Sequence, residues 1–180
     1  MKRWIAPAAV LIASGVIAHA VTLYSAPSVI MDRALTTLKN RGIALHAFTT
    51  PQRIAPQTQA VVRPPPDQSY PLCRYDLSAA GGSFKVTITA WPGYQSLSFF
   101  DDATNNFATF RATGEKRVIE LFPRDPLAQK VADGENPPTG ETWQSTPSER
   151  GVALIRRLAP TPELYEAALK ASEGDACEKL

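Results

Sequence analysis

The sequence predicts a mainly β, α+β fold: an antiparallel β-sandwich or barrel-like domain, with an N-terminal transmembrane helix and a C-terminal helix. Three observations support this fold class. An uncharged apolar run lies near the N-terminus, short alternating segments begin at residue 72, and a helix-start signal stands at Thr161. The 180 residues divide into an anchor with its flanking helix (1–42), a proline-rich connector (43–71) and a β-rich domain (72–180).

The N-terminal run indicates export of the rest of the chain. Lys2 and Arg3 precede an uncharged stretch from Trp4 to Tyr24. As a helix this stretch is about 32 Å long, close to a hydrocarbon core of about 30 Å. We expect an uncleaved single-pass anchor, because hydrophobicity continues past the small-residue site Ala18-His19-Ala20. A signal peptide cleaved at that site is the alternative.

A second helical segment follows the anchor. Ser25 and Pro27 resemble a helix start, and Asn40-Arg41-Gly42 is a stop signal. The segment between them either extends the anchor helix or lies on the membrane surface. The prolines between residues 51 and 71 then indicate an extended connector.

From residue 72 the pattern changes to short strands bounded by turn residues. The spacing of roughly 10 residues between turns is typical of an antiparallel sandwich or barrel. Thr161-Pro162-Glu163 then starts a helix that ends near Gly174. The predicted strands are 72–77, 84–89, 94–100, 106–111 and 117–122, followed after a long loop (123–140) by two closing strands, 141–146 and 151–158.

The two cysteines indicate an oxidising compartment. Cys73 and Cys177 lack the spacing of a metal site and suit one disulfide, which would pin the C-terminal tail to the first strand. Two separate unpaired thiols remain the alternative. Basic residues flank both ends of the anchor, so charge alone does not orient it. The cysteines favour a cytoplasmic N-terminus with the body outside.

Charge and motifs exclude several functions. Of the 19 Lys/Arg and 17 Asp/Glu, five basic residues and one acid lie in residues 1–41, so the body is slightly acidic. A generally basic nucleic-acid binder is therefore excluded. The two histidines, His19 and His46, both precede the β-rich domain, which leaves no histidine there for a zinc site or catalytic triad. We predict no catalytic residue, metal or cofactor.

Three polar residues are weak candidates for ligand binding: Arg74, Asp76 and Asp101. Asp101 belongs to a turn cluster with Asp102 and Asn105, and capping of backbone groups explains such acids more simply than calcium binding does.

Three motifs resemble the domain-of-unknown-function 1254 family, in its short, membrane-anchored bacterial form. They are Cys73 to Leu77, the strand Gly93 to Asp101 leading to Asn105-Asn106-Phe107, and Ser148 to Leu158. Gln95 stands where the resemblance leads us to expect an aromatic residue. The resemblance implies a β-rich envelope domain that often sits beside a related partner domain in longer relatives, and it supplies no activity.

We therefore expect an envelope protein of the bacterial inner membrane, with a single membrane span and its C-terminal domain in the periplasm. Its expected role is non-catalytic docking of the membrane or an exported envelope partner. The alternative is a periplasmic enzyme or small-ligand carrier with a pocket between the sheet and the C-terminal helix.

Overall fold

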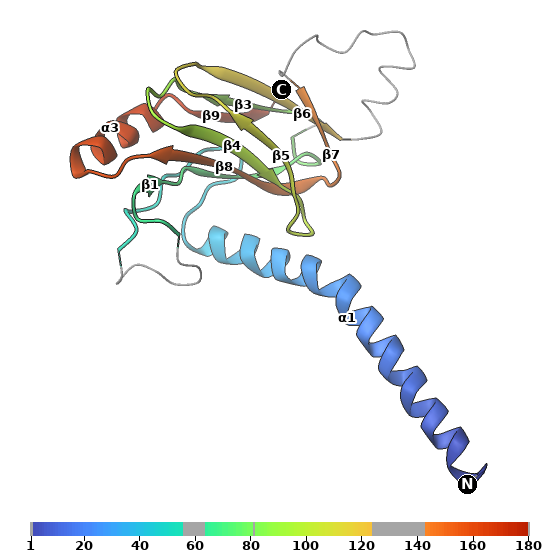
Figure 1. The fold of residues 1–180 in the computed structure, drawn as a ribbon. Coiled ribbons are helices and arrows are strands. Elements are labelled where there is room, and N and C mark those ends of the chain that lie inside the picture. Colours follow the sequence, from blue (N-terminus) through green and yellow to red (C-terminus); the bar gives the residue numbers. More distant parts are fainter. Residues whose placement is uncertain (1, 56–63, 81, 124–142, 180) are drawn as a thin grey trace.

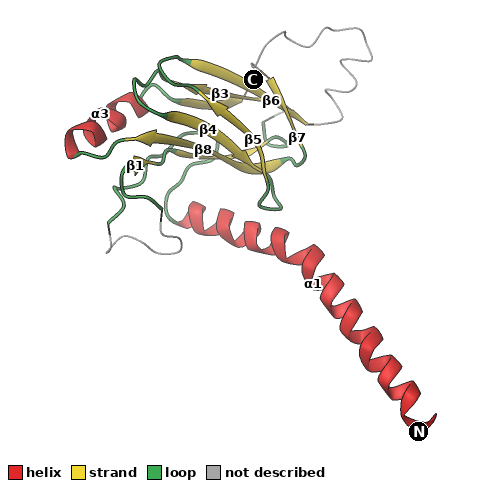
Figure 2. Ribbon diagram, viewed as in Figure 1, coloured by secondary structure: helices red, strands yellow, loops and turns green. Residues whose placement is uncertain are grey.

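Two β-sheets lie face to face in a computed structural model that describes residues 2–55, 64–80, 82–123 and 143–179 (Figures 1 and 2). A long helix extends away from this sandwich, and a short helix lies at one end of it. The predicted mainly β, α+β fold is confirmed. Much of the predicted loop (123–140) and part of the connector (56–63) lie outside the described residues. The elements are η1 (Lys2–Trp4), α1 (Ile5–Asn40), β1 (Gln68–Ser69), β2 (Leu72–Asp76), β3 (Phe84–Ile88), β4 (Gln95–Phe100), β5 (Asn106–Arg111), β6 (Arg117–Pro123), β7 (Trp143–Thr146), β8 (Arg150–Leu158), α3 (Pro162–Ser172) and β9 (Ala176–Lys179).

Strand β8 is the centre of one sheet, although the sequence suggests a closing strand. It pairs with β1, β2 and β4, and β5 lies outside β4. The apolar run Val152 to Ile155 fits this position, because a central strand is covered on both faces. The second sheet has the order β7-β6-β3-β9. Its β6–β7 pair is parallel, and the other ladders are antiparallel.

The core lies between the two sheets. Alternate residues of each strand point inward, and the aromatic rings of Tyr75 and Phe84 meet across the gap with centroids 5.6 Å apart. The buried core residues come from both sheets, so the fold is a packed sandwich rather than an open sheet. The largest fully buried apolar members of the core are Tyr75, Leu77, Phe84, Ile88, Leu97, Phe99, Ile119, Leu121 and Ile155.

Helix α1 is continuous from Ile5 to Asn40, so the flanking segment extends the apolar N-terminal helix. Ser25 is not a cap, since its hydroxyl donates to the carbonyl of Val21 (2.7 Å) within the helix. Pro27 lies inside the helix, which bends about halfway along its length (Figure 1). The helix ends as predicted, and Gly42 adopts a left-handed φ of +81° just beyond it.

The C-terminal tail forms a strand that the sequence analysis misses. Helix α3 starts as predicted, with the Thr161 side chain accepting a hydrogen bond from the backbone of Leu164 (3.3 Å). After it, β9 pairs antiparallel with β3, and Cys177 is bonded to Cys73 of β2 with a Cα–Cα distance of 6.6 Å. The bond therefore joins β9 of one sheet to β2 of the other. The disulfide therefore pins the tail to the first predicted strand, as expected, and it crosses from one sheet to the other.

A buried ion pair joins β8 to the segment between α3 and β9. Arg157, at the end of β8, is fully buried, and its guanidinium donates to both carboxylate oxygens of Asp175 (2.6 and 2.7 Å). It also donates to the hydroxyl of Ser172 at the end of α3 (3.0 Å) and to the side-chain oxygen of Gln95. All three guanidinium nitrogens thus have hydrogen-bond partners, as a buried charge requires.

The buried ion pair explains why residue 95 is a glutamine rather than an aromatic residue. Gln95 faces Arg157 across the β4–β8 ladder and accepts the hydrogen bond from Arg157 Nε. Its amide nitrogen donates to the carbonyls of Thr89 (2.9 Å) and Ala112 (3.1 Å). An aromatic ring at this position would leave the Nε–H of Arg157 buried without a partner.

We predict that loss of the disulfide lowers the stability of the domain. The bond spans 104 residues, and the chain-entropy model gives about 4–5 kcal/mol for a loop of this length. Urea unfolding of the full chain in detergent, with and without reductant, measures the effect. A Cys73→Ala/Cys177→Ala variant should unfold earlier and no longer respond to reductant. An unchanged midpoint would contradict the prediction.

We predict that Arg157→Met destabilises the domain by about 3–5 kcal/mol, because it leaves the Asp175 carboxylate buried without its counter-ion. The double variant Arg157→Met/Asp175→Leu should recover part of this loss. Lys85→Met is the matched control, since the Lys85–Glu178 pair (3.9 Å) also involves β9 but is partly exposed to solvent. Its cost should stay below about 1 kcal/mol in the same unfolding experiment.

Candidate functional site

A groove lies between helix α1 and the sheet that contains β2 and β8, and we call it the helix–sheet groove. Its volume is about 420 Å³, and three basic and two acidic side chains line it. It contains two of the three predicted ligand-binding residues, Arg74 and Asp76. The lining residues are Asp32, Leu35, Thr36, Lys39, Leu45, Arg74, Tyr75, Asp76 and Arg150.

The basic side chains of the groove connect α1 to the sandwich. Arg74 donates from Nε to the carbonyl of Ile43 (2.9 Å), just beyond the end of the helix. Arg150 reaches back to Asp32 of α1, with 3.3 Å between Nη2 and Oδ1. Half or more of each side chain of this second pair is exposed, so solvent weakens the attraction. The groove lining carries one net positive charge, and two of its three basic side chains already have partners.

Asp76 holds the turn that follows β2. Its Oδ1 accepts hydrogen bonds from the Ser78 hydroxyl and from the backbone N–H of Ala79 (3.2 Å). Burial acts to raise the pKa of the Asp76 carboxyl, but these hydrogen bonds outweigh it and leave the pKa below its ordinary value. The stabilisation from this carboxylate is thus present at neutral pH and is lost as the pH falls through the lowered pKa.

Asp101 lies away from the groove lining, in the loop between β4 and β5. It is 4% exposed, and its carboxylate accepts hydrogen bonds from the backbone N–H groups of Ala103 (2.9 Å) and Asn105 (2.8 Å). The side-chain amide of Asn105 donates to its other oxygen (2.9 Å). Asp76 and Asp101 therefore hold separate turns and do not form a carboxylate pair.

Tyr75 lies beneath the groove with its hydroxyl turned into the core. The hydroxyl donates to the carbonyl of Phe100 (3.1 Å), and burial raises the pKa of this phenol well above its ordinary value. Gly151 makes room for it, because a Cβ there would collide with the Tyr75 ring and the Phe100 carbonyl. The phenol stays protonated at neutral pH and packs as part of the core.

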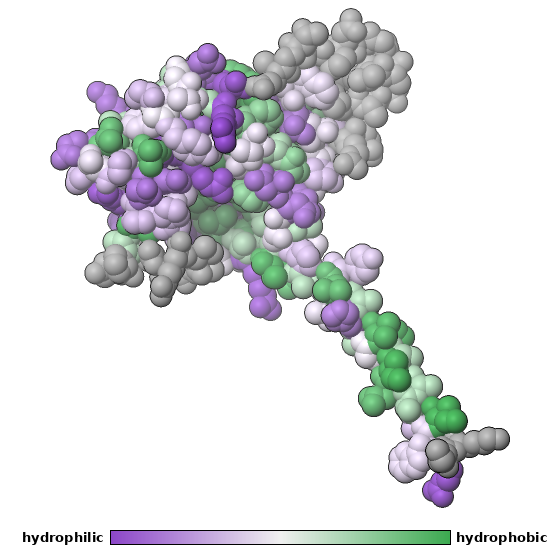
Figure 3. Space-filling model, in the orientation of Figure 1, coloured by the Kyte–Doolittle hydropathy of each residue, from purple (hydrophilic) through white to green (hydrophobic). Residues whose placement is uncertain are grey.

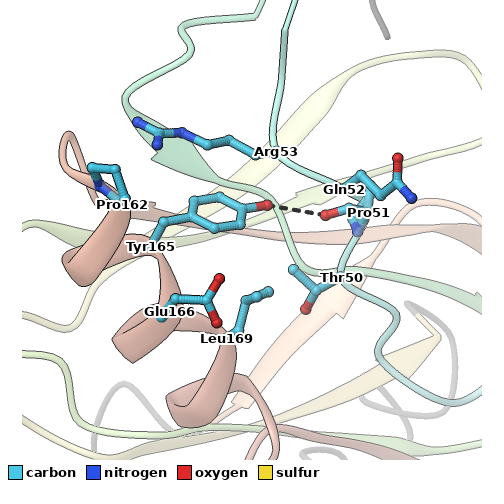
Figure 4. Close-up of a pocket in the computed structure, with 8 residues that line it drawn as sticks. All are labelled: Thr50, Pro51, Gln52, Arg53, Pro162, Tyr165, Glu166 and Leu169. Carbon is cyan, nitrogen blue, oxygen red and sulfur yellow. Dashed lines mark hydrogen bonds between the residues drawn. The ribbon is translucent and has the colours of Figure 1, made fainter.

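A second pocket, of about 380 Å³, lies between α3 and residues 50–53 (Figure 4). The hydroxyl of Tyr165 donates to the carbonyl of Pro51 (3.1 Å), and the guanidinium carbon of Arg53 lies 5.5 Å from the centre of the same ring. Burial raises the pKa of the Tyr165 phenol, and the Arg53 charge partly opposes this. This pocket lies beside the C-terminal helix, but its other wall is the connector rather than a sheet.

Sequence reasoning misses most of the groove. Asp32 and Arg150 are 118 residues apart, and no local pattern links them. The charged face of the segment before Asn40 is the one available signal. Within the described ranges, no three His, Cys, Asp or Glu side chains are placed to hold a metal ion together.

A family model for proteins of unknown function, DUF1254, matches residues 46–179 of the sequence. The chain belongs to this family. The match covers most of the connector and the β-rich domain, in which the three sequence motifs lie. Comparison with curated proteins found no match.

Among solved structures, this chain is similar in fold to the VPA0106 protein of Vibrio parahaemolyticus, with a TM-score of 0.61 and 15% sequence identity. The similarity covers 86% of this chain and 35% of that protein, so this chain spans about a third of its length. An uncharacterised protein of Burkholderia cenocepacia has a TM-score of 0.44 and 11% identity, over 64% of this chain and 32% of that one.

We predict that Asp101→Ala lowers the free energy of unfolding by about 1–3 kcal/mol, because it removes the carboxylate that accepts hydrogen bonds from the backbone of Ala103 and Asn105. Asp102→Ala is the matched control next to it in the sequence, and we expect a change within about 0.5 kcal/mol. Thermal or urea unfolding measures both. Equal effects of the two substitutions would show that Asp101 does not hold the turn.

Proposed function

We propose that this DUF1254 protein is a single-pass protein of the bacterial inner membrane, whose periplasmic domain docks an exported partner without catalysing a reaction. The observation that carries the proposal is the apolar half of α1, which extends from the sandwich and is not covered by any other described part of the chain (Figures 1 and 3). Leu11 is 73% exposed and Val10 is 68% exposed. Such a surface is costly in water and is stabilised in a lipid bilayer.

The other half of α1 supports a role in fixing the position of the domain. Met31 is buried although most of the helix is exposed, and Ile43 is buried just beyond its end. Together with the Arg150–Asp32 and Arg74–Ile43 contacts, they join the helix to the sandwich. Residues 25–40 continue the helix for about 24 Å past Tyr24. The helix therefore acts as a stalk that holds the domain at a set distance from the membrane.

The disulfide supports the periplasmic side of the membrane. Cys73 and Cys177 are paired and buried, and such structural disulfides form and persist outside the reducing cytoplasm. With the domain in the periplasm, the positive residues Lys2 and Arg3 lie on the cytoplasmic side.

Docking is favoured over catalysis because several buried and half-buried polar side chains already make structural contacts. Asp76 and Asp101 each hold a turn, and the buried Arg157–Asp175 pair joins the two sheets. The same fold occupies about a third of the longer Vibrio protein, where it is covalently attached to further chain. We propose that the partner here is an exported protein that docks against this domain.

A small-ligand carrier is the second candidate, and the pocket beside Tyr165 favours it. That pocket offers an aromatic ring, a guanidinium and a carboxylate around about 380 Å³. A carrier released from the membrane by cleavage near Ala20 would use it in solution.

One topology experiment distinguishes the membrane-anchored docking protein from the released carrier. The full chain, with a C-terminal tag, is expressed in a bacterium, and the cells are fractionated and treated with protease from the periplasmic side. We expect a full-length, membrane-bound, protease-accessible protein whose cysteines resist thiol labelling until they are reduced.

Two results would overturn the proposal. A shortened soluble product, restored to full length in an Ala18→Leu variant that blocks the cleavage site, would favour the carrier. A protease-protected domain with two labelled thiols would reverse the topology.

A further inference from the structure

Three polar residues lie side by side on the outer face of the sheet that contains β8. Ser96 of β4 pairs with Arg111 of β5 on one side and with Arg156 of β8 on the other (Figure 1). Cross-strand partners point to the same face of a sheet. Because Leu97, next to Ser96 in β4, is buried in the core between the sheets, Ser96 and both arginines point away from that core. We call Arg111, Ser96 and Arg156 the arginine row.

The two positive charges of the arginine row have no acidic partner in the part of the chain that the structure describes. Neither Arg111 nor Arg156 forms an ion pair there, whereas Lys85, Arg150 and Arg157 do. The two side chains of the row start about 10 Å apart, which is two strand spacings, so their charges repel each other. An anion held between them would remove this repulsion.

The hydrogen-bond donors of the arginine row are only partly used. Arg156 donates from Nη1 to the hydroxyl of Ser98 (3.1 Å), and the described residues offer no acceptor to its Nε or Nη2. Ser96 is 1% exposed, and its hydroxyl oxygen accepts from the Tyr94 hydroxyl (3.2 Å). The hydroxyl hydrogen of Ser96 and the guanidinium of Arg111 have no acceptor among these residues. A buried hydroxyl that accepts without donating leaves one donor unsatisfied.

The hydroxyls around the arginine row come from one of the three family motifs. Tyr94, Ser96 and Ser98 alternate along the motif Gly93 to Asp101. The residues between them point inward and are fully buried. Packing of the core thus explains the inward half of this motif, and it does not explain the three outward-facing hydroxyls.

We infer that the arginine row binds the phosphate group of a phosphate monoester. Two guanidinium groups carry two positive charges, and a phosphate monoester carries about −1.5 to −2 at neutral pH, whereas a carboxylate carries only one negative charge. Arginine forks match the oxygens of a phosphate group, and the free hydroxyl hydrogen of Ser96 supplies a further donor. The row lies in the sandwich, so this inference does not rest on the proposed membrane topology.

Thermal unfolding of the full chain in a neutral detergent tests the inference, with glycerol phosphate as the probe. A ligand that binds only the folded chain raises the unfolding midpoint, and the rise across a concentration series gives the affinity. Sodium chloride at the same ionic strength is the reference, and it should not produce this rise. Equal shifts with the two salts would overturn the inference, because they would reflect screening alone.

Variants of the arginine row locate the binding. Arg111→Gln and Arg156→Gln should each weaken the binding of glycerol phosphate by about tenfold, because each removes a charge and its fork of donors. Ser96→Ala should weaken it by about threefold. Arg150→Gln is the matched control, since Arg150 lies on the same face of β8 but already pairs with Asp32. Its effect should stay within about twofold, and an equal loss in this control would overturn the site.

Stability without glycerol phosphate distinguishes a binding role from a structural one. Arg111→Gln removes one of two like charges, so in sodium chloride its unfolding midpoint should be unchanged or slightly raised. A lowered midpoint in sodium chloride, with the glycerol phosphate shift intact, would show that Arg111 supports the fold and would overturn the inference.

A lipid arm distinguishes a soluble phosphate monoester from a phospholipid headgroup. The full chain is placed in nanodiscs of phosphatidylcholine or of phosphatidylglycerol, and the glycerol phosphate titration is repeated. The phosphodiester of phosphatidylglycerol carries one negative charge, so we expect the same affinity for glycerol phosphate in both discs. An Arg111-dependent rise of the midpoint that phosphatidylglycerol produces and glycerol phosphate does not would assign the row to a lipid and overturn the monoester.

Discussion

The contact between Arg157 and Asp175 is the constraint on which the sandwich depends. Two charges removed from water cost several kcal/mol each unless every hydrogen-bonding position is used. Here Gln95 of β4, Ser172 of α3 and the backbone of Thr89 beyond β3 complete the arrangement. The ends of these elements must therefore meet at one point. The pair adds little net stability compared with apolar packing, but it specifies which ends come together.

The segment from Asp175 to Cys177 makes a second long-range contact, this time a covalent one. Asp175 enters the buried pair, and Cys177, two residues later, bonds to β2 of the other sheet. Residues two apart in an extended segment point to the same side, so both side chains are directed between the sheets. One charged and one covalent contact thus fix the register of β9 against β3. Neither contact depends on α1, so the sandwich and its stalk are held by different interactions.

The sequence predicts the helices and strands that show a local periodicity. It predicts few of the contacts between residues that are far apart in the chain. The alternation in Phe84–Ile88 marks a strand because one face is buried, and Thr161 marks a helix start because its side chain caps the backbone. Strand β9 is missed because Ala176–Lys179 is too short for an alternation to stand out. The side-chain partners of Arg157, Gln95, Ser172 and Asp175, lie 62, 15 and 18 residues away, and the helix–sheet groove forms only when α1 reaches Arg150.

The position of β9 in the chain also sets the order in which the fold can be completed. Translation delivers a polypeptide from its N-terminus, so strands β2 to β8 are made before residues 175–179. During that interval β3 has an unpaired edge, Arg157 is a charge without its acid, and Cys73 is an unpaired thiol. An exposed strand edge of this kind invites pairing with other chains. Completion of the fold is thus postponed until its last strand arrives, and the half-made domain is the form most in need of a chaperone.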